Sequence, residues 1–98
     1  MKVKFLTLAK LELDNATLYY ELELIGLGKI FKEEIKKAIL RIKLFPQGWS
    51  LDNKNKIRKY TLHKFPYKIL YSLENDCILI IAIAHQHRKP DYWIDRIN

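Results

Sequence analysis

The residues of this sequence best suited to chemistry are cations that lie in two stretches without acids. Between Asp52 and Glu74 stand six of them: Lys54, Lys56, Arg58, Lys59, Lys64 and Lys68. A second stretch, residues 77–90, holds His85, His87, Arg88 and Lys89. Phosphate backbones bind such arrays, and bases stack on aromatic rings, for which Tyr60, Tyr92 and Trp93 are available. The pattern predicts a cationic surface for nucleic acid, with solvated edge-strand lysines as the structural alternative.

Three histidines add groups that transfer protons near neutral pH. Cleavage of RNA by the neighbouring 2′-hydroxyl needs a base, an acid, and cations that stabilise the phosphorane. The residue types for all three tasks are present in His63, His85, His87, Lys59, Lys68 and Arg88. Because no carboxylate accompanies them, the base would have to be a histidine or a lysine of lowered pKa. For each histidine taken alone, a structural role at a strand end is the alternative.

Other kinds of site find little support in the sequence. The cationic stretches lack paired carboxylates, so we expect no metal site and no cofactor. The single cysteine, Cys77, begins an apolar run and is expected in the core, which fits a reducing cytoplasm. That run, residues 77–84, is too short to cross a bilayer, so no membrane partner is expected. The formal net charge of +7 favours an anionic partner, with simple solubility as the alternative.

The elements that would position these residues begin with a short strand and two helices. Residues 2–6 alternate and predict an opening strand. Residues 9–24 have apolar side chains at helical spacing, with Glu12 predicted away from the apolar face. A second helix, residues 27–45, ends before Pro46. The short connection between them predicts an antiparallel helix hairpin.

Three further strands are predicted after a loop at residues 45–55, namely residues 56–62, 67–73 and 77–84. In the first of them, Lys59 shares one face with Thr61, and Arg58 shares the other with Tyr60. A last helical turn or two is expected in residues 91–97. The prediction is an α+β fold in one domain, residues 1–98, with the helix hairpin packed on a mainly antiparallel four-stranded sheet.

Six blocks of the chain, taken in order, resemble the RelE/ParE superfamily of toxins from bacterial type II toxin–antitoxin modules. The first three are Ala9-x-x-Glu12-Leu13-x-x-Ala16-x-x-Tyr19-Tyr20-Glu21, Leu27-Gly28-x-x-Phe31-x-x-Glu34, and Ala38…Ile42…Pro46. The others are Ile57-Arg58, Phe65-Pro66-Tyr67-Lys68-Ile69-x-Tyr71, and Ile83-Ala84-His85-x-x-Arg88-x-Pro90-x-Tyr92-Trp93. The resemblance covers nearly the whole chain and implies the fold that periodicity predicts.

The resemblance implies a growth-arresting toxin, with two possible targets. RelE-like members cut mRNA on the ribosome, using sheet cations and a C-terminal tyrosine, whereas ParE-like members poison DNA gyrase. Both are neutralised by a small antitoxin that wraps the toxin, here expected to cover the basic site with an acidic, partly helical segment. We expect ribosome-associated mRNA cleavage as the main activity, with gyrase inhibition by protein binding, or non-catalytic nucleic-acid binding, as alternatives.

Position by position, the resemblance implies roles for several residues. Lys59 corresponds to a strand lysine of the RelE type, and Lys68 stands where those enzymes have an arginine. The arginine beyond the last strand corresponds to His87 or Arg88, and the terminal tyrosine to Tyr92 or Trp93. A second strand lysine is replaced by Thr61. The Phe-Pro-Tyr and Arg-x-Pro-x-Tyr-Trp blocks instead resemble ParE-type members.

Overall fold

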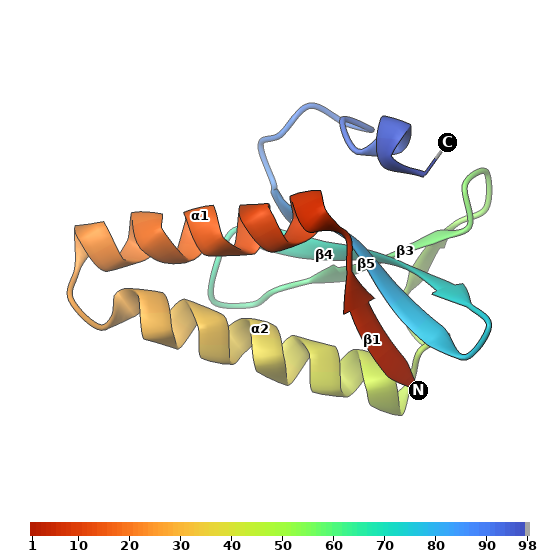
Figure 1. Ribbon diagram of the computed structural model, residues 1–98, viewed down its shortest axis with the longest axis horizontal. Coiled ribbons are helices and arrows are strands. Elements are labelled where there is room, and N and C mark those ends of the chain that lie inside the picture. The colour runs from red at the N-terminus through yellow and green to blue at the C-terminus, as the bar shows by residue number, and fades with distance from the viewer. Residues whose placement is uncertain (98) are drawn as a thin grey trace.

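The structure is a computed structural model that describes residues 1–97. This part of the chain forms two α-helices and a five-stranded sheet (Figure 1). Strand β1 (Lys2–Phe5) is followed by helices α1 (Thr7–Glu23) and α2 (Leu27–Leu44). The remaining elements are β2 (Ser50–Asp52), β3 (Ile57–Thr61), β4 (Tyr67–Glu74), β5 (Cys77–His85) and a 3-10 helix, η1 (Ile94–Arg96). The predicted α+β fold with a helix hairpin is confirmed.

The hairpin is held together where α1 approaches the start of α2. Gly26 adopts φ 92°, a left-handed conformation that glycine takes without steric cost. The Glu21 carboxylate accepts hydrogen bonds from the N–H groups of Gly26 and Gly28, at 3.0 and 3.1 Å, so it caps the first turn of α2. A Cβ on Gly28 would lie 2.7 Å from the Thr17 carbonyl oxygen, so close helix packing requires glycine there.

The sheet has the order β1-β5-β4-β3-β2, with β1 parallel to β5 and all other pairs antiparallel. Strand β5 is an interior strand between β1 and β4, and it is apolar on both faces, as its uninterrupted apolar run predicts; the middle strand of the five is β4. The prediction of four strands was wrong by one, because β2 forms within the expected loop by pairing with β3. All three β2 residues are exposed, so no alternation marks them as a strand. The final helix is shorter than expected, a single 3-10 turn.

Two apolar cores lie on opposite faces of the sheet. On one face the hairpin packs its buried side chains, such as Phe31 and Ile35, against Tyr71 and Ile80. On the other face a smaller cluster forms around Ile81, covered by the C-terminal segment that carries Trp93. We call this second side the open face. The register between β4 and β5 skips Ile81, a bulge that leaves both Ile81 and Ala82 on the open face, while Ile80 and Ile83 face the helices.

Candidate functional site

A groove on the open face brings together Lys59 of β3 and Lys68 of β4. The groove has a volume of ≈ 330 Å³ and is also lined by Asp52, Asp91 and Trp93. Lys59 pairs with Leu70 and Thr61 with Lys68, so the two lysines are diagonal neighbours on one face of the sheet. The expected grouping of these two cations is present, but two carboxylates that the charge pattern did not anticipate share the groove.

Lys68 is the lysine whose protonation this environment changes. Partial burial lowers its pKa below the ordinary value of 10.5, and the nearby Lys59 ammonium lowers it further, while Asp91 opposes both effects. The positive charge of half-buried Lys68 is therefore costlier than that of a lysine in water. The groove therefore favours a ligand that brings negative charge between the two ammonium groups.

A smaller cleft of ≈ 90 Å³ continues from Lys68 to the loop after β5, where Arg88 and Lys89 line it. The Arg88 guanidinium lies 3.9 Å from the centroid of the Tyr92 ring, a cation–π contact that orients an otherwise exposed side chain. Four of the predicted cations, Lys59, Lys68, Arg88 and Lys89, thus follow one another along the open side of the molecule.

The other predicted cations lie elsewhere, so the prediction of one surface for all of them was wrong. Arg58 points to the helix side and donates hydrogen bonds to the carbonyl oxygens of Gln47 and Trp49, at 2.9 and 2.8 Å. Lys64 lies beside α2 and forms an ion pair with Glu34 at 3.3 Å. Exposed positions in the turn between β2 and β3 are occupied by Lys54 and Lys56.

The three histidines do not join Lys59 in the groove. His63 is exposed in the turn between β3 and β4. His85 ends β5 with its ring edge-on to Tyr67, at a centroid distance of 5.1 Å. The backbone N–H of His87 donates to Nδ1 of His85 at 3.1 Å, and the two rings lie 5.2 Å apart. The groove lining contains none of the three, but His85 lines the smaller cleft together with Lys68 and Arg88, so one histidine does lie beside a strand lysine.

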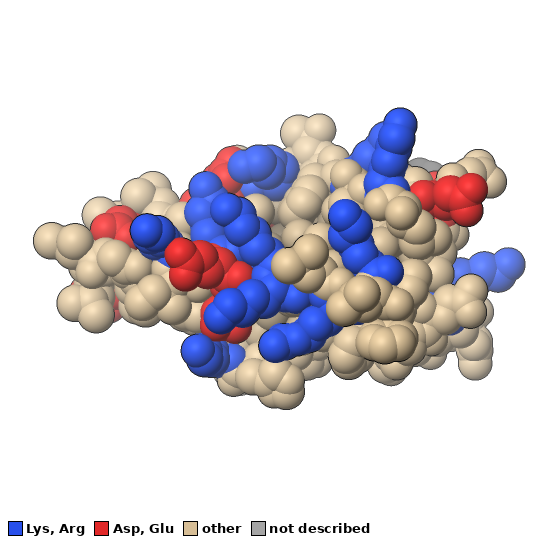
Figure 2. All heavy atoms as spheres, turned by 90° about the horizontal axis from the view of Figure 1, so that it is seen from below, with Lys and Arg blue, Asp and Glu red and all other residues tan. Residues whose placement is uncertain are grey.

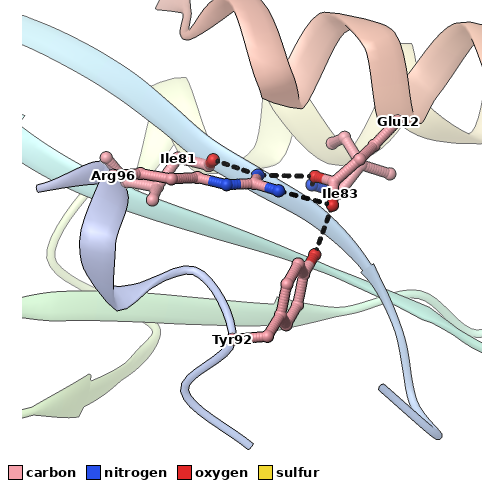
Figure 3. Close-up of polar contacts among 5 residues, drawn as sticks. All are labelled: Glu12, Ile81, Ile83, Tyr92 and Arg96. Carbon is pink, nitrogen blue, oxygen red and sulfur yellow. Dashed lines mark hydrogen bonds and ion pairs between the residues drawn. The ribbon is translucent and has the colours of Figure 1, made fainter. Parts of the chain in front are cut away.

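The aromatic residues expected to stack on bases are occupied by contacts within the protein. Tyr60 is buried on the helix side and accepts a hydrogen bond from Arg41 at 2.9 Å. Trp93 is buried against the open face of the sheet. Tyr92 donates its hydroxyl proton to Glu12 at 2.6 Å (Figure 3). Burial therefore contradicts the expected stacking by Tyr60 and Trp93, while one face of the half-buried Tyr92 ring is covered by Arg88.

Glu12 is the centre of a polar cluster that fixes the C-terminal segment, and we call Glu12, Tyr92 and Arg96 the clamp (Figure 3). The Arg96 guanidinium donates to both Glu12 carboxylate oxygens, at 2.8 and 2.9 Å, and to the Ile81 carbonyl at 3.0 Å. The N–H of Ile83 donates to Glu12 at 3.0 Å. Burial raises the pKa of Tyr92 above its ordinary value, and the bond to Glu12 raises it further. Tyr92 is thus a poor proton carrier at neutral pH.

The sequence prediction missed the clamp. Helical periodicity placed Glu12 away from the apolar face, whereas its side chain is only 16% exposed between α1 and β5. Arg96, 12% exposed, carried no signal because its partner lies far away in the sequence.

Among residues 1–97, no three His, Cys, Asp or Glu side chains are arranged to hold a metal ion. Neither described helix is long and apolar enough to cross a membrane.

Comparison with known proteins decides the family. Residues 3–90 match the profile of the ParE toxin of the type II toxin–antitoxin system parDE. This chain belongs to the ParE toxin family. The match ends at Pro90, so the clamp residues Tyr92 and Arg96 of this ParE toxin lie beyond the matched range.

A solved structure described as the chromosomal ParDE toxin–antitoxin system from P. aeruginosa has the same fold. It superposes with a TM-score of 0.71 at 24% sequence identity, covering 87% of this chain and 95% of the other. No curated protein sequence matches this ParE toxin. As a member of the family, the chain is the toxin of a type II toxin–antitoxin pair, and an antitoxin is its partner.

Proposed function

We propose that this ParE toxin arrests growth by binding DNA gyrase, and that its cognate antitoxin prevents this. The observation that carries the proposal is the match of residues 3–90 to the ParE profile, because ParE-like members of the superfamily are the ones that poison gyrase. Residues 1–98 would act as one toxin domain. Gyrase works on chromosomal DNA, so the cytoplasm is the compartment in which the proposal places the toxin.

The geometry of the open face supports binding over RNA cleavage. A cleaving site needs an acid and a base on either side of the reacting phosphate. No histidine lines the groove, His85 alone reaches the smaller cleft beside Lys68, and the hydroxyl of Tyr92 is held by Glu12, so no acid and base face each other across the groove. The cations Lys59, Lys68, Arg88 and Lys89 remain, which suit a surface that holds an anionic partner without cleaving it.

Ribosome-dependent mRNA cleavage remains the second candidate, on one observation. Lys68 has a lowered pKa beside Lys59, and a lysine of lowered pKa is a group that can accept a proton. In this candidate, Lys59, Lys68 and Arg88 would stabilise the phosphorane. The positions resemble those that RelE-type enzymes use.

Induction of the chain in a bacterial host, with pulse labelling of DNA and protein synthesis, separates the two candidates. The proposal predicts early loss of DNA synthesis with induction of the SOS response, and recovery when the antitoxin of the same operon is expressed. Protein synthesis would continue during the first minutes. Early loss of protein synthesis with new mRNA 5′ ends, abolished by Lys59→Gln with Lys68→Gln, would contradict the proposal in favour of cleavage.

A further inference from the structure

The outer face of the helix hairpin carries an apolar stripe that no part of residues 1–97 covers. On α1 and just after it, the residues Leu8, Leu11, Leu18, Leu22 and Ile25 are 49%, 52%, 56%, 78% and 92% exposed. With Asn15 they follow the alternating spacing of three and four residues that brings one helix against another. A single asparagine in such a stripe is a common way to fix the register of paired helices.

The stripe cannot be part of the core of a single copy. It lies opposite Ala9, Leu13 and Ala16, which pack toward the sheet. The hairpin also extends well beyond the strands, so its tip has no sheet beneath it (Figure 1). Contiguous exposed apolar faces of this kind mark protein–protein contacts.

Helix α2 supplies a complementary outer face. Its exposed apolar residues are Ile30, Leu40 and Leu44. It holds six cations and two acids, a formal charge of +4, whereas α1 holds one cation and four acids, a formal charge of −3. Figure 2 shows lysine and arginine side chains crowding the side of the molecule on which α2 lies. The two helices of the hairpin therefore carry net charges of opposite sign.

We propose that this surface binds a second copy of the chain, with α1 of each copy against α2 of the other. A two-fold axis parallel to the helices places α1 across from the partner copy's α2 in antiparallel direction, forming a four-helix bundle. Because the same residues act on both sides, each contact occurs twice.

The positions along the two helices fit this arrangement. Tyr20 packs on Phe31 with ring centroids 5.1 Å apart, which sets the level of α1 relative to α2. Because the two helices are antiparallel, a residue a given number of positions before Tyr20 is level with the residue the same number of positions after Phe31. Leu11 is therefore level with Leu40, and Asp14 with Lys37. Since a two-fold axis along the helices preserves these levels, leucine meets leucine and carboxylate meets ammonium across the interface.

Charge decides which helices meet. Even with Glu12 left out, because Arg96 neutralises it, α1 keeps more acids than cations, so a pairing of α1 with α1 would oppose two negative helices, and α2 with α2 two positive ones. Like charges across an interface are unfavourable, and opposite charges select the partner and the register. Of the three arrangements, only the crossed one brings helices of opposite charge together. The proposal holds whichever target the toxin binds.

Sedimentation velocity of the purified chain tests the proposal. Between about 1 and about 100 µM, the protein should pass from its chain mass of 11.8 kDa to twice that mass, as a dimer of micromolar affinity does. Leu18→Glu should weaken the dimer at least about tenfold. Leu51→Glu, the same change at an exposed leucine of β2, should leave it unchanged. Far-UV circular dichroism and thermal unfolding establish that each variant is folded.

Charge reversal tests the crossed pairing itself. Asp14→Lys alone and Lys37→Glu alone should each weaken the dimer, and the two together should restore it. A double variant as weak as either single variant would overturn the crossed arrangement. A wild-type chain that stays monomeric at every concentration would overturn the proposal. If Leu18→Glu then also abolished antitoxin binding, the face would belong to the antitoxin instead.

Discussion

Substitution of Glu12 by glutamine should destabilise this protein more than any other conservative change on α1. The carboxylate accepts hydrogen bonds from Ile83, Tyr92 and both terminal nitrogens of Arg96, at 3.0, 2.6, 2.8 and 2.9 Å. An amide keeps the shape but loses the charge, and its NH₂ group donates where the carboxylate accepted. The Arg96 guanidinium, only 12% exposed, would then lack its counter-charge.

The size of the effect follows from burial. Breaking a buried ion pair by removing one partner costs about 3–5 kcal/mol. Arg96 keeps its bond to the Ile81 carbonyl, and both side chains have some contact with water, so we expect the lower end, about 3 kcal/mol. For a domain of this length that corresponds to a fall in Tm of more than about 10 °C.

Urea and thermal unfolding followed by circular dichroism measure this difference. Glu23→Gln is the matched control, because Glu23 is exposed on the same helix and should change stability by less than about 0.5 kcal/mol. Arg96→Met should cost less when combined with Glu12→Gln than the two single changes added together, since the pair is already broken. If the Glu12→Gln and Glu23→Gln variants unfold at the same urea concentration and the same temperature, the clamp does not stabilise the C-terminal segment as described.

Three further predictions concern other parts of the molecule. Burial raises the pKa of Tyr71 to about 12, so the stability it confers is complete below pH 10 and is lost as pH rises toward 12. Tyr71→Phe removes the hydrogen bond that the hydroxyl donates to the Pro46 carbonyl at 2.7 Å, so it should cost about 1 kcal/mol at pH 7, and this cost should shrink in alkaline urea titrations; a constant difference would contradict this. In NMR titrations Lys68 should deprotonate below 10.5, and Lys59→Gln should raise its pKa, whereas an unchanged value would show that the two ammonium groups do not interact. Gly28→Ala should cost about 1–3 kcal/mol in urea unfolding, because its Cβ would meet α1; wild-type stability would refute close packing there.

The fold could be predicted because its long elements bury one regular stripe or face. The spacing of Ala9, Leu13 and Ala16 located α1, and the unbroken apolar run of β5 placed that strand in the interior of the sheet, between two neighbours. Strand β2 could not be found in this way, since it is short, fully exposed, and defined only by its pairing with β3. The bulge at Ile81 left no local signal either.

The candidate site was predictable only in part, because charge patterns do not say which face a side chain occupies. Alternation along β3 correctly predicted that Lys59 and Arg58 lie on opposite faces of the sheet. The prediction of a single cationic surface then placed both on one face, which was wrong. Lys64 forms an ion pair with Glu34, which links the turn after β3 to helix α2. Glu12 and Arg96 meet only in the folded chain, so their separate positions in the sequence gave no indication of the clamp.

The most direct test of the central claim is a supercoiling assay with purified gyrase, relaxed plasmid and this ParE toxin freed of its antitoxin. A toxin that binds gyrase should abolish supercoiling at micromolar concentration and the antitoxin should restore it, while mRNA translated on ribosomes with the same toxin remains intact. Full gyrase activity in molar excess of folded toxin, together with cleavage of the translated mRNA, would contradict it.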